Sequence, residues 1–93
     1  MQNNTQVHIV VSGFVQGVFF RVNTKNKAQE LGLKGRVKNL SNGNVDIVAE
    51  GQKEVLEKLI VWCHQGPPRS RVDDVLTEWC APTSEFSSFS IAD

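Results

Sequence analysis

Hydrophobic and polar positions alternate along several segments of the chain, with the period of two that is typical of a strand burying one face. Val7, Ile9 and Val11 follow this pattern and predict a first strand that ends near Gly13. The same alternation predicts further strands over residues 35–40, 44–50 and 71–80, then a short edge strand containing Phe89 and Ile91.

Apolar residues recur at helical spacing in two segments that lie between these strands. In the first, Phe20, Thr24 and Ala28 share one stripe, and Gly32 follows as at many helix C-termini. In the second, residues 52–65, the apolar positions again fall on one face. Both segments are therefore predicted to be amphipathic helices that pack on a sheet.

Two local features refine the predicted strands. Asn42 and Gly43 stand between two alternating segments and predict a tight hairpin, since both residue types tolerate positive φ. Val72 and Val75 have opposite parity within one predicted strand, which predicts a bulge or bend there.

The first strand of this hairpin carries basic residues and the second carries acidic residues. Arg36 and Lys38 share one face of the first strand, and Asp46 and Glu50 share one face of the second. We expect these residues to pair across the hairpin on a solvated surface of the sheet.

The predicted elements follow in the order βαββαβ, with an extra short strand at the end. Sequential strands with two crossover helices predict the α+β class and a ferredoxin-like two-layer sandwich, in which an antiparallel sheet carries both helices on one face. Residues 1–5 are expected to form a flexible N-terminal tail, and residues 6–93 a single domain.

Composition limits the classes of partner. Ten Lys or Arg balance ten Asp or Glu, and the resulting zero net charge argues against a broad nucleic-acid footprint while leaving room for one local anion site. The polar N-terminus resembles no leader, and no apolar run approaches the ~20 residues of a membrane span. We therefore expect a cytoplasmic protein without a membrane segment.

Cysteine and histidine offer little chemistry. Cys63 and Cys80 show no Cys-x-x-Cys spacing; buried, reduced thiols are predicted, with a disulfide between them as the less favoured alternative. His8 and His64 lie far apart in sequence without an acidic or cysteine cluster, so no metal site is expected.

Residues 12–21, with the sequence SGFVQGVFFR, join the first strand to the first helix. Gly13 and Gly17 allow consecutive N–H groups to point inward as an anion-binding nest, and a helix N-terminus adds free donors. Arg21 lies near the first helical turn, where the macrodipole disfavours a cation unless an anion is shared. Alternatively, the glycines only form a tight turn and Arg21 is a solvated surface residue; spacing alone does not decide.

Asn39 is the second unusual polar position. By strand alternation it shares a face with Val37, the face expected to meet the helices, so its amide must find partners. It either caps the turn over residues 40–44 or takes part in chemistry, and both interpretations stay open at this point.

Two motifs carry a resemblance to a known family. The first reads Gly13-x-Val15-Gln16-Gly17-Val18-x-Phe20-Arg21, and the second reads Gly35-x-Val37-x-Asn39-x-x-Asn42-Gly43-x-Val45. On these motifs the chain resembles the acylphosphatases, small ferredoxin-like enzymes that hydrolyse carboxyl-phosphate anhydrides. The likeness covers nearly the whole chain after residue 5, so residues 6–93 are expected to form an acylphosphatase-like domain.

The resemblance implies an acylphosphate phosphohydrolase that converts a small acyl phosphate into a carboxylate and inorganic phosphate. It implies that Arg21 is the catalytic arginine that binds phosphate, and that Asn39 orients the attacking water. We further expect a monomer that needs no metal or other cofactor and binds neither nucleic acid nor membrane. The backbone amides of the implied phosphate-binding loop belong to Val15, Gln16, Gly17, Val18, Phe19 and Phe20.

Two other classes share this fold. A non-catalytic regulatory domain would bind phosphate or another anion through the same loop without hydrolysis. An RNA-recognition module shares the βαββαβ order but stacks bases on exposed aromatic residues, and residues 44–50 contain none. The chain departs from the acylphosphatase pattern at Asn23 and Arg36, where relatives often carry aromatics, and at Asn42, where aspartate is usual; neither implied catalytic side chain is affected.

Overall fold

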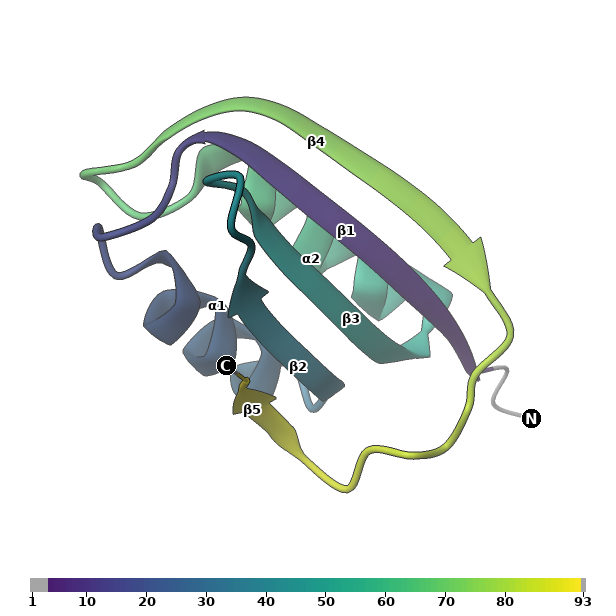
Figure 1. Cartoon of the computed structure of the whole chain (residues 1–93). Coiled ribbons are helices and arrows are strands. Elements are labelled where there is room, and N and C mark those ends of the chain that lie inside the picture. The colour runs from purple at the N-terminus through teal and green to yellow at the C-terminus, as the bar shows by residue number, and fades with distance from the viewer. Residues whose placement is uncertain (1–3, 93) are drawn as a thin grey trace.

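The computed structural model describes residues 4–92, and its elements follow the predicted order with a fifth strand (Figure 1). Asn4 and Thr5, which were expected in the tail, belong to the first strand, and the rest of that predicted tail, residues 1–3, lies outside the described residues. The elements are β1 (Asn4–Phe14), α1 (Phe20–Glu30), β2 (Lys34–Asn39), β3 (Val45–Gln52), α2 (Lys53–Gln65), β4 (Arg71–Cys80) and β5 (Phe89–Ile91).

The strands form one sheet in the order β4-β1-β3-β2-β5, with both helices packed on the same face (Figure 1). The β4-β1-β3-β2 part is antiparallel throughout, as predicted. β5 differs from the expectation of an antiparallel sheet because it pairs in parallel with β2. The chain leaves β4 at the end of the sheet where β2 begins, so β5 must run in the same direction as β2.

The core lies between this sheet and the two helices. On β1, Val7, Ile9 and Val11 are fully buried, which confirms the alternation seen in the sequence. Each such side chain contributes roughly 1.5–3 kcal/mol when it leaves water. The buried stripes of the two helices and the inner face of β3 pack against these valines and this isoleucine. Their fully buried members include Phe20, Thr24, Ala28, Ile47, Leu56, Leu59 and Cys63.

The predicted hairpin connects β2 to β3, although its turn differs in detail from the expectation. Gly43 has φ 95°, whereas Asn42 is not among the residues with positive φ. Instead, the Oδ1 atom of Asn42 accepts a hydrogen bond from the N–H of Asn44 at 3.0 Å. An asparagine that bonds backbone two residues ahead closes a turn without a left-handed conformation.

The predicted bulge is confirmed where β4 pairs with β1. Ser12 pairs with Asp74 and Gly13 with Val72, so Asp73 is an extra residue on β4. The register shift explains the opposite parity of the two valines in this strand.

The open face of the sheet is less solvated than predicted. Asp46 and Glu50 are buried, with 5% and 8% of their surface exposed. Asp46 accepts a hydrogen bond from Arg36 at 2.9 Å and contacts the imidazole of His8, whereas Glu50 does not pair with Lys38. Burial by itself raises the pKa of Asp46, but the bonds from His8 and Arg36 outweigh it, so this pKa is lowered. Asp46 thus connects β3 to β1 and β2, and Glu50 connects β3 to β1 through Gln6.

The two cysteines are both free, but only one is buried as predicted. Burial raises the pKa of the Cys63 thiol to about 12, which leaves it protonated and unreactive at neutral pH. Cys80 is exposed, because it lies at the end of the edge strand β4, and its Sγ lies 3.0 Å from Oε1 of Gln6. The prediction of a buried thiol is therefore wrong for Cys80.

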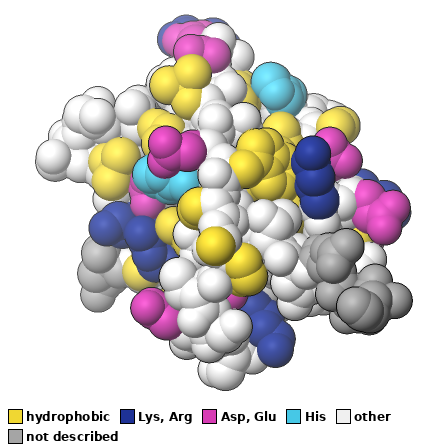
Figure 2. Space-filling view, turned by 90° about the vertical axis from the view of Figure 1, so that its right-hand side faces the viewer, with side chains coloured by type: hydrophobic (Ala, Val, Ile, Leu, Met, Phe, Trp, Pro, Cys, Tyr) yellow, Lys and Arg dark blue, Asp and Glu magenta, His cyan; other side chains and the backbone are white. Residues whose placement is uncertain are grey.

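Surface charge is mixed on the face drawn in Figure 2, where basic and acidic side chains lie interspersed with apolar ones. This agrees with the balance of charge over the whole sequence. Among residues 4–92, neither helix has the length and apolar character needed to cross a membrane.

Glu50 also fastens the connection between β4 and β5 to the sheet. Its carboxylate accepts hydrogen bonds from the N–H of Thr83 at 2.6 Å and of Ser84 at 3.2 Å, and from Nε2 of Gln6 at 2.7 Å. Burial by itself raises the pKa of Glu50, but the bonds from Thr83, Gln6 and Ser84 outweigh it and the pKa is lowered. The ionised carboxylate therefore stabilises the segment between β4 and β5, and so the pairing of β5 with β2.

Replacing Glu50 by Gln is expected to lower the free energy of unfolding by about 1–3 kcal/mol at pH 7, as loss of hydrogen bonds to a charged group does. A lowered folded-state pKa means that this contribution is present above the unfolded-state pKa and is lost as pH falls through the folded-state pKa. The difference between wild type and variant should therefore shrink from about pH 5 downward. Urea unfolding over a pH series measures it, with the exposed Glu57→Gln as control; a difference independent of pH would contradict the assignment.

Candidate functional site

The loop between β1 and α1, residues 15–19, follows an unusual backbone path. Gly17 has φ 75°, and Phe19, the residue that caps α1, has φ 64° and ψ 22°. A left-handed phenylalanine costs roughly 1–3 kcal/mol and persists only where its surroundings hold it. Asn23 does so, because its backbone N–H and its Nδ2 both donate to the carbonyl of Phe19, at 3.0 and 2.8 Å.

The N–H groups of this loop and of the first three residues of α1 lack acceptors in the part of the chain that the structure describes. Within residues 4–92, no hydrogen bond uses the N–H of any residue from 15 to 22 as donor. The first N–H of the helix that finds a carbonyl is that of Asn23. A run of free donors at a helix N-terminus carries a partial positive charge and favours an anion.

Arg21 is the second residue of α1 and adds a full positive charge to these donors. Its side chain is half-buried, the first turn of α1 holds no acidic residue, and no ion pair among residues 4–92 involves it. A cation at a helix N-terminus is disfavoured by the macrodipole. The arrangement thus accumulates positive charge that the described part of the protein does not neutralise.

Asn39 is the last residue of β2, opposite Val45 of β3. Its Oδ1 atom is buried and has no hydrogen-bond partner among residues 4–92. The turn that follows is closed instead by backbone bonds, among them Leu40 N–H to the Asn44 carbonyl at 2.8 Å. The capping role considered from the sequence is therefore filled without this side chain, which leaves an acceptor free.

Arg21 and Asn39 line the same open cavity of about 370 Å³ at the end of the sheet where β1, β2 and β5 terminate. Of the predicted site residues, Gln16 and Val18 do not line it: Gln16 turns toward the β2–β3 hairpin, and Val18 is buried. Val22 and Ile91 also line the cavity but were not predicted as site residues. The sequence contained no signal for Ile91, because its position depends on the parallel pairing of β5 with β2. The lining residues are Val15, Gly17, Phe19, Phe20, Arg21, Val22, Asn39 and Ile91.

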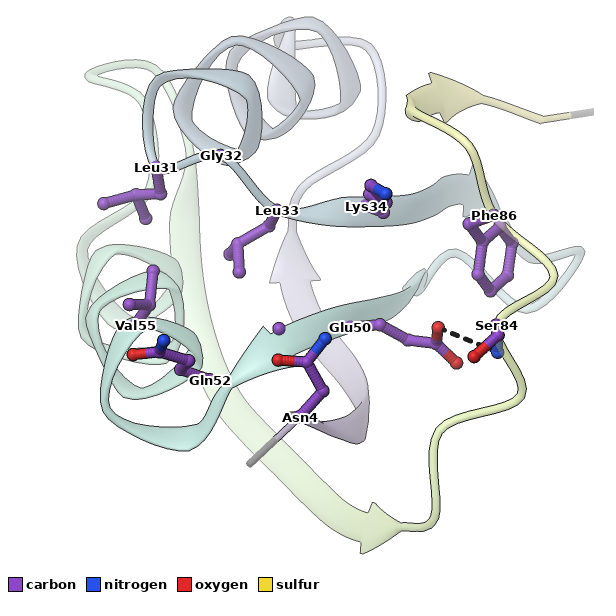
Figure 3. A pocket seen from close by; sticks show the side chains of 11 residues that line it. Asn4, Leu31, Gly32, Leu33, Lys34, Glu50, Gln52, Val55, Ser84 and Phe86 are labelled. Carbon is purple, nitrogen blue, oxygen red and sulfur yellow. Dashed lines mark hydrogen bonds between the residues drawn. The ribbon is translucent and has the colours of Figure 1, made fainter. Parts of the chain in front are cut away.

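A larger cavity of about 480 Å³ lies at the opposite end of the sheet, near the start of β2 and the end of β3 (Figure 3). Its buried ionisable group is Glu50, whose carboxylate is bonded to Ser84 and other donors of the protein. Since these bonds already satisfy the carboxylate, size alone does not make this cavity a reactive site. The smaller cavity has the unpaired donors and acceptor.

No group of three or more His, Cys, Asp or Glu side chains that could hold a metal ion occurs within residues 4–92. Of the described residues that line the cavity, Arg21 alone carries a charged side chain.

Comparisons with known proteins bear directly on this arrangement. The family model described as Acylphosphatase matches residues 7–91. The chain belongs to the acylphosphatase family. An acylphosphatase of Marinobacter nauticus is 51% identical over 82 residues, with 88% of this chain and 89% of that protein covered.

Other relatives span almost the whole chain. An acylphosphatase of Pelotomaculum thermopropionicum is 48% identical over 90 residues, covering 97% of this chain and 98% of that protein. The structure of an acylphosphatase from Coxiella burnetii superposes with a TM-score of 0.91 at 43% identity, covering 97% of this chain and 94% of that chain.

The predicted family, fold and enzyme class are thereby confirmed: the chain is an acylphosphatase-type hydrolase. The alternative of a non-catalytic anion-binding domain is not favoured, since these relatives are named as the enzyme. The roles predicted for Arg21, Asn39 and the loop amides stay predictions.

Alanine substitutions at Gly13, near the end of β1, and at Gly17, in the loop, should distinguish backbone strain from a steric clash. At Gly17, with φ 75°, an added Cβ meets no atom within 4 Å, so Gly17→Ala is expected to cost about 1–2 kcal/mol of stability through backbone strain alone. At Gly13, with φ 127°, the Cβ would lie 2.2 Å from the carbonyl oxygen of Arg71. Gly13→Ala should therefore cost about 3 kcal/mol or more. Urea unfolding measures both, and equal losses would contradict this account.

Proposed function

We propose that this chain hydrolyses acyl phosphates in the cavity lined by Arg21 and Asn39. The observation that carries the proposal is that Arg21 and Asn39 line one open cavity beside the loop N–H groups. Among the described residues, the guanidinium of Arg21 forms no ion pair, the Oδ1 atom of Asn39 has no hydrogen-bond partner, and these N–H groups lack acceptors. Phosphoryl transfer requires that the negative charge on the equatorial oxygens be neutralised and that the nucleophile be aligned, and the protein contributes little covalent chemistry.

The phosphoryl group of the substrate would be bound by the loop and by Arg21. Backbone N–H groups of residues 15–20 donate to its oxygens, and the guanidinium grips two of them in a planar fork. The positive charge that accumulates here is then matched by the two negative charges of the phosphoryl group. Charge that spreads over the oxygens in the transition state is stabilised by the same preorganised donors.

Asn39 would orient the attacking water. Its free Oδ1 accepts a hydrogen bond from the water, which directs a lone pair of the water oxygen at phosphorus. A new P–O bond forms, the bond between phosphorus and the acyl oxygen breaks, and the carboxylate leaves with that electron pair. Both protons of the water stay on the phosphate, so R–CO–OPO₃²⁻ and water yield R–COO⁻ and H₂PO₄⁻.

A carboxylate is a good leaving group, so the reaction does not require a general acid. The acyl group would extend toward the outer part of the cavity, where Phe19, Val22 and Ile91 are 68%, 44% and 37% exposed. These side chains offer an apolar surface that accommodates the acyl group without directing it by charge.

Three broader expectations belong to the same proposal. We propose a monomer that acts in the cytoplasm and binds no nucleic acid. Zero net charge, and the interspersed charges of the face seen in Figure 2, support the last of these.

Replacing Arg21 by Ala is expected to lower kcat/KM for acetyl phosphate by at least about 10³, as loss of an arginine that stabilises phosphoryl transfer does. Phosphate release from wild type and variant measures it. Arg69→Ala is the matched control, because Arg69 is exposed and does not line the cavity, and it should keep full activity. Near-normal turnover by the Arg21 variant would refute its role.

Replacing Asn39 by Ala should lower kcat by about 10²–10³, the cost of removing one positioned polar group, while competitive inhibition by inorganic phosphate changes little. The inhibition constant reports the loop and Arg21, whereas kcat reports the aligned water. Asn26→Ala, an exposed asparagine of α1, is the control. A variant that loses phosphate inhibition along with turnover would show that Asn39 binds the phosphoryl group instead.

A further inference from the structure

The side chain of Gln16 joins the loop over residues 15–19 to the β2–β3 hairpin. Its Nε2 donates to the carbonyl of Leu40 at 2.7 Å and to the carbonyl of Asn44 at 2.8 Å, so both amide hydrogens are used. These carbonyls stand at the two ends of the hairpin turn, and the turn is closed by Leu40 N–H to the Asn44 carbonyl. One side chain thus grips both ends of a turn that lies more than twenty residues away in sequence.

No other hydrogen bond among residues 4–92 connects this loop to the hairpin. The remaining bonds of the loop run to α1, through Asn23 and the carbonyl of Phe19. Leu40 directly follows Asn39, so a displacement of the Leu40 carbonyl moves Asn39 as well. The separation between the loop amides and the Asn39 carboxamide therefore depends on the Gln16 bridge.

We propose that Gln16 is a positioning residue, whose side-chain amide sets the position of Asn39 relative to the loop that would bind the phosphoryl group. The inference rests on the proposed roles of Arg21 and Asn39. Gln16 does not line the cavity, so its side chain acts through the hairpin and not on the substrate. A displacement of about 1 Å between reacting groups costs on the order of 10²-fold in rate.

The test replaces Gln16 by Met, which keeps the length of the side chain and removes both donors. We expect kcat for acetyl phosphate to fall by about 10–10²-fold, while the inhibition constant of inorganic phosphate stays within about twofold. The phosphate constant is spared because the amides and Arg21 belong to one continuous segment of loop and helix. Equal losses of turnover and of phosphate inhibition would overturn the proposal, because Gln16 would then hold the loop itself.

The matched control is Gln6→Met. Nε2 of Gln6 also makes a long-range hydrogen bond, to Glu50 at 2.7 Å, but at the opposite end of the sheet. This variant should lower the urea midpoint and leave kcat unchanged. A merely structural role for Gln16 predicts the same behaviour for both variants, and that outcome would also overturn the proposal.

A double substitution tests whether Gln16 acts through Asn39. In the Asn39→Ala background, Gln16→Met should change kcat by less than about twofold, because the group that it positions is gone. An undiminished effect in that background would refute the inference. If Gln16→Met fails to fold, Gln16→Asn serves instead, since it stays polar but is one methylene too short to reach both carbonyls; the same criteria apply. Failure of the proposed function is distinguishable, because it appears as full activity in the Arg21→Ala and Asn39→Ala single variants.

Discussion

The left-handed path of the loop from β1 to α1 is the constraint on which the rest of the structure depends. Among residues 4–92 it leaves the N–H groups of residues 15–22 without acceptors, whereas most backbone donors in folded proteins are paired. The path requires a strained, positive φ at Phe19. Asn23 stabilises this conformation by two hydrogen bonds to the carbonyl of Phe19. Strain that is maintained by specific contacts is typical of a binding site. We propose that the occupant is the phosphoryl group of an acyl phosphate, which has several oxygen acceptors.

The two ends of the sheet differ in the sign of their charged group and in whether the protein provides partners for it. At one end, Glu50 is buried, and its carboxylate accepts hydrogen bonds from Gln6 and from the segment that leads to β5. At the other end, Arg21 and the loop amides accumulate positive charge with no carboxylate beside them. The bonds at the first end stabilise the fold, and we propose that the unpaired positive charge at the second end binds an anion. The polar groups of the larger cavity, next to Glu50, therefore serve to hold the fold together.

The departures from the family pattern acquire local explanations. Asn23 bonds the carbonyl of Phe19, Arg36 pairs with the buried Asp46, and Asn42 closes the hairpin turn through its Oδ1. Each polar side chain forms a contact that is compatible with the sheet, the loop and the hairpin as they stand. None of the three lines the cavity of Arg21 and Asn39. The departures thus alter how the scaffold is held together and leave the proposed chemistry unchanged.

Periodicity and turn residues in the sequence were sufficient for both helices, the four long strands, the hairpin and the bulge, because these depend on contacts that are local or that alternate regularly. The two motifs were sufficient for the family and for naming Arg21 and Asn39. Three features needed the tertiary structure: the parallel pairing of β5, which brings Ile91 to the cavity; the burial of Asp46 and Glu50 on a face expected to be solvated; and the bridge from Gln16 to the hairpin. All three arise from contacts between residues far apart in the chain, whose geometry is set by how the sheet closes and not by any local pattern.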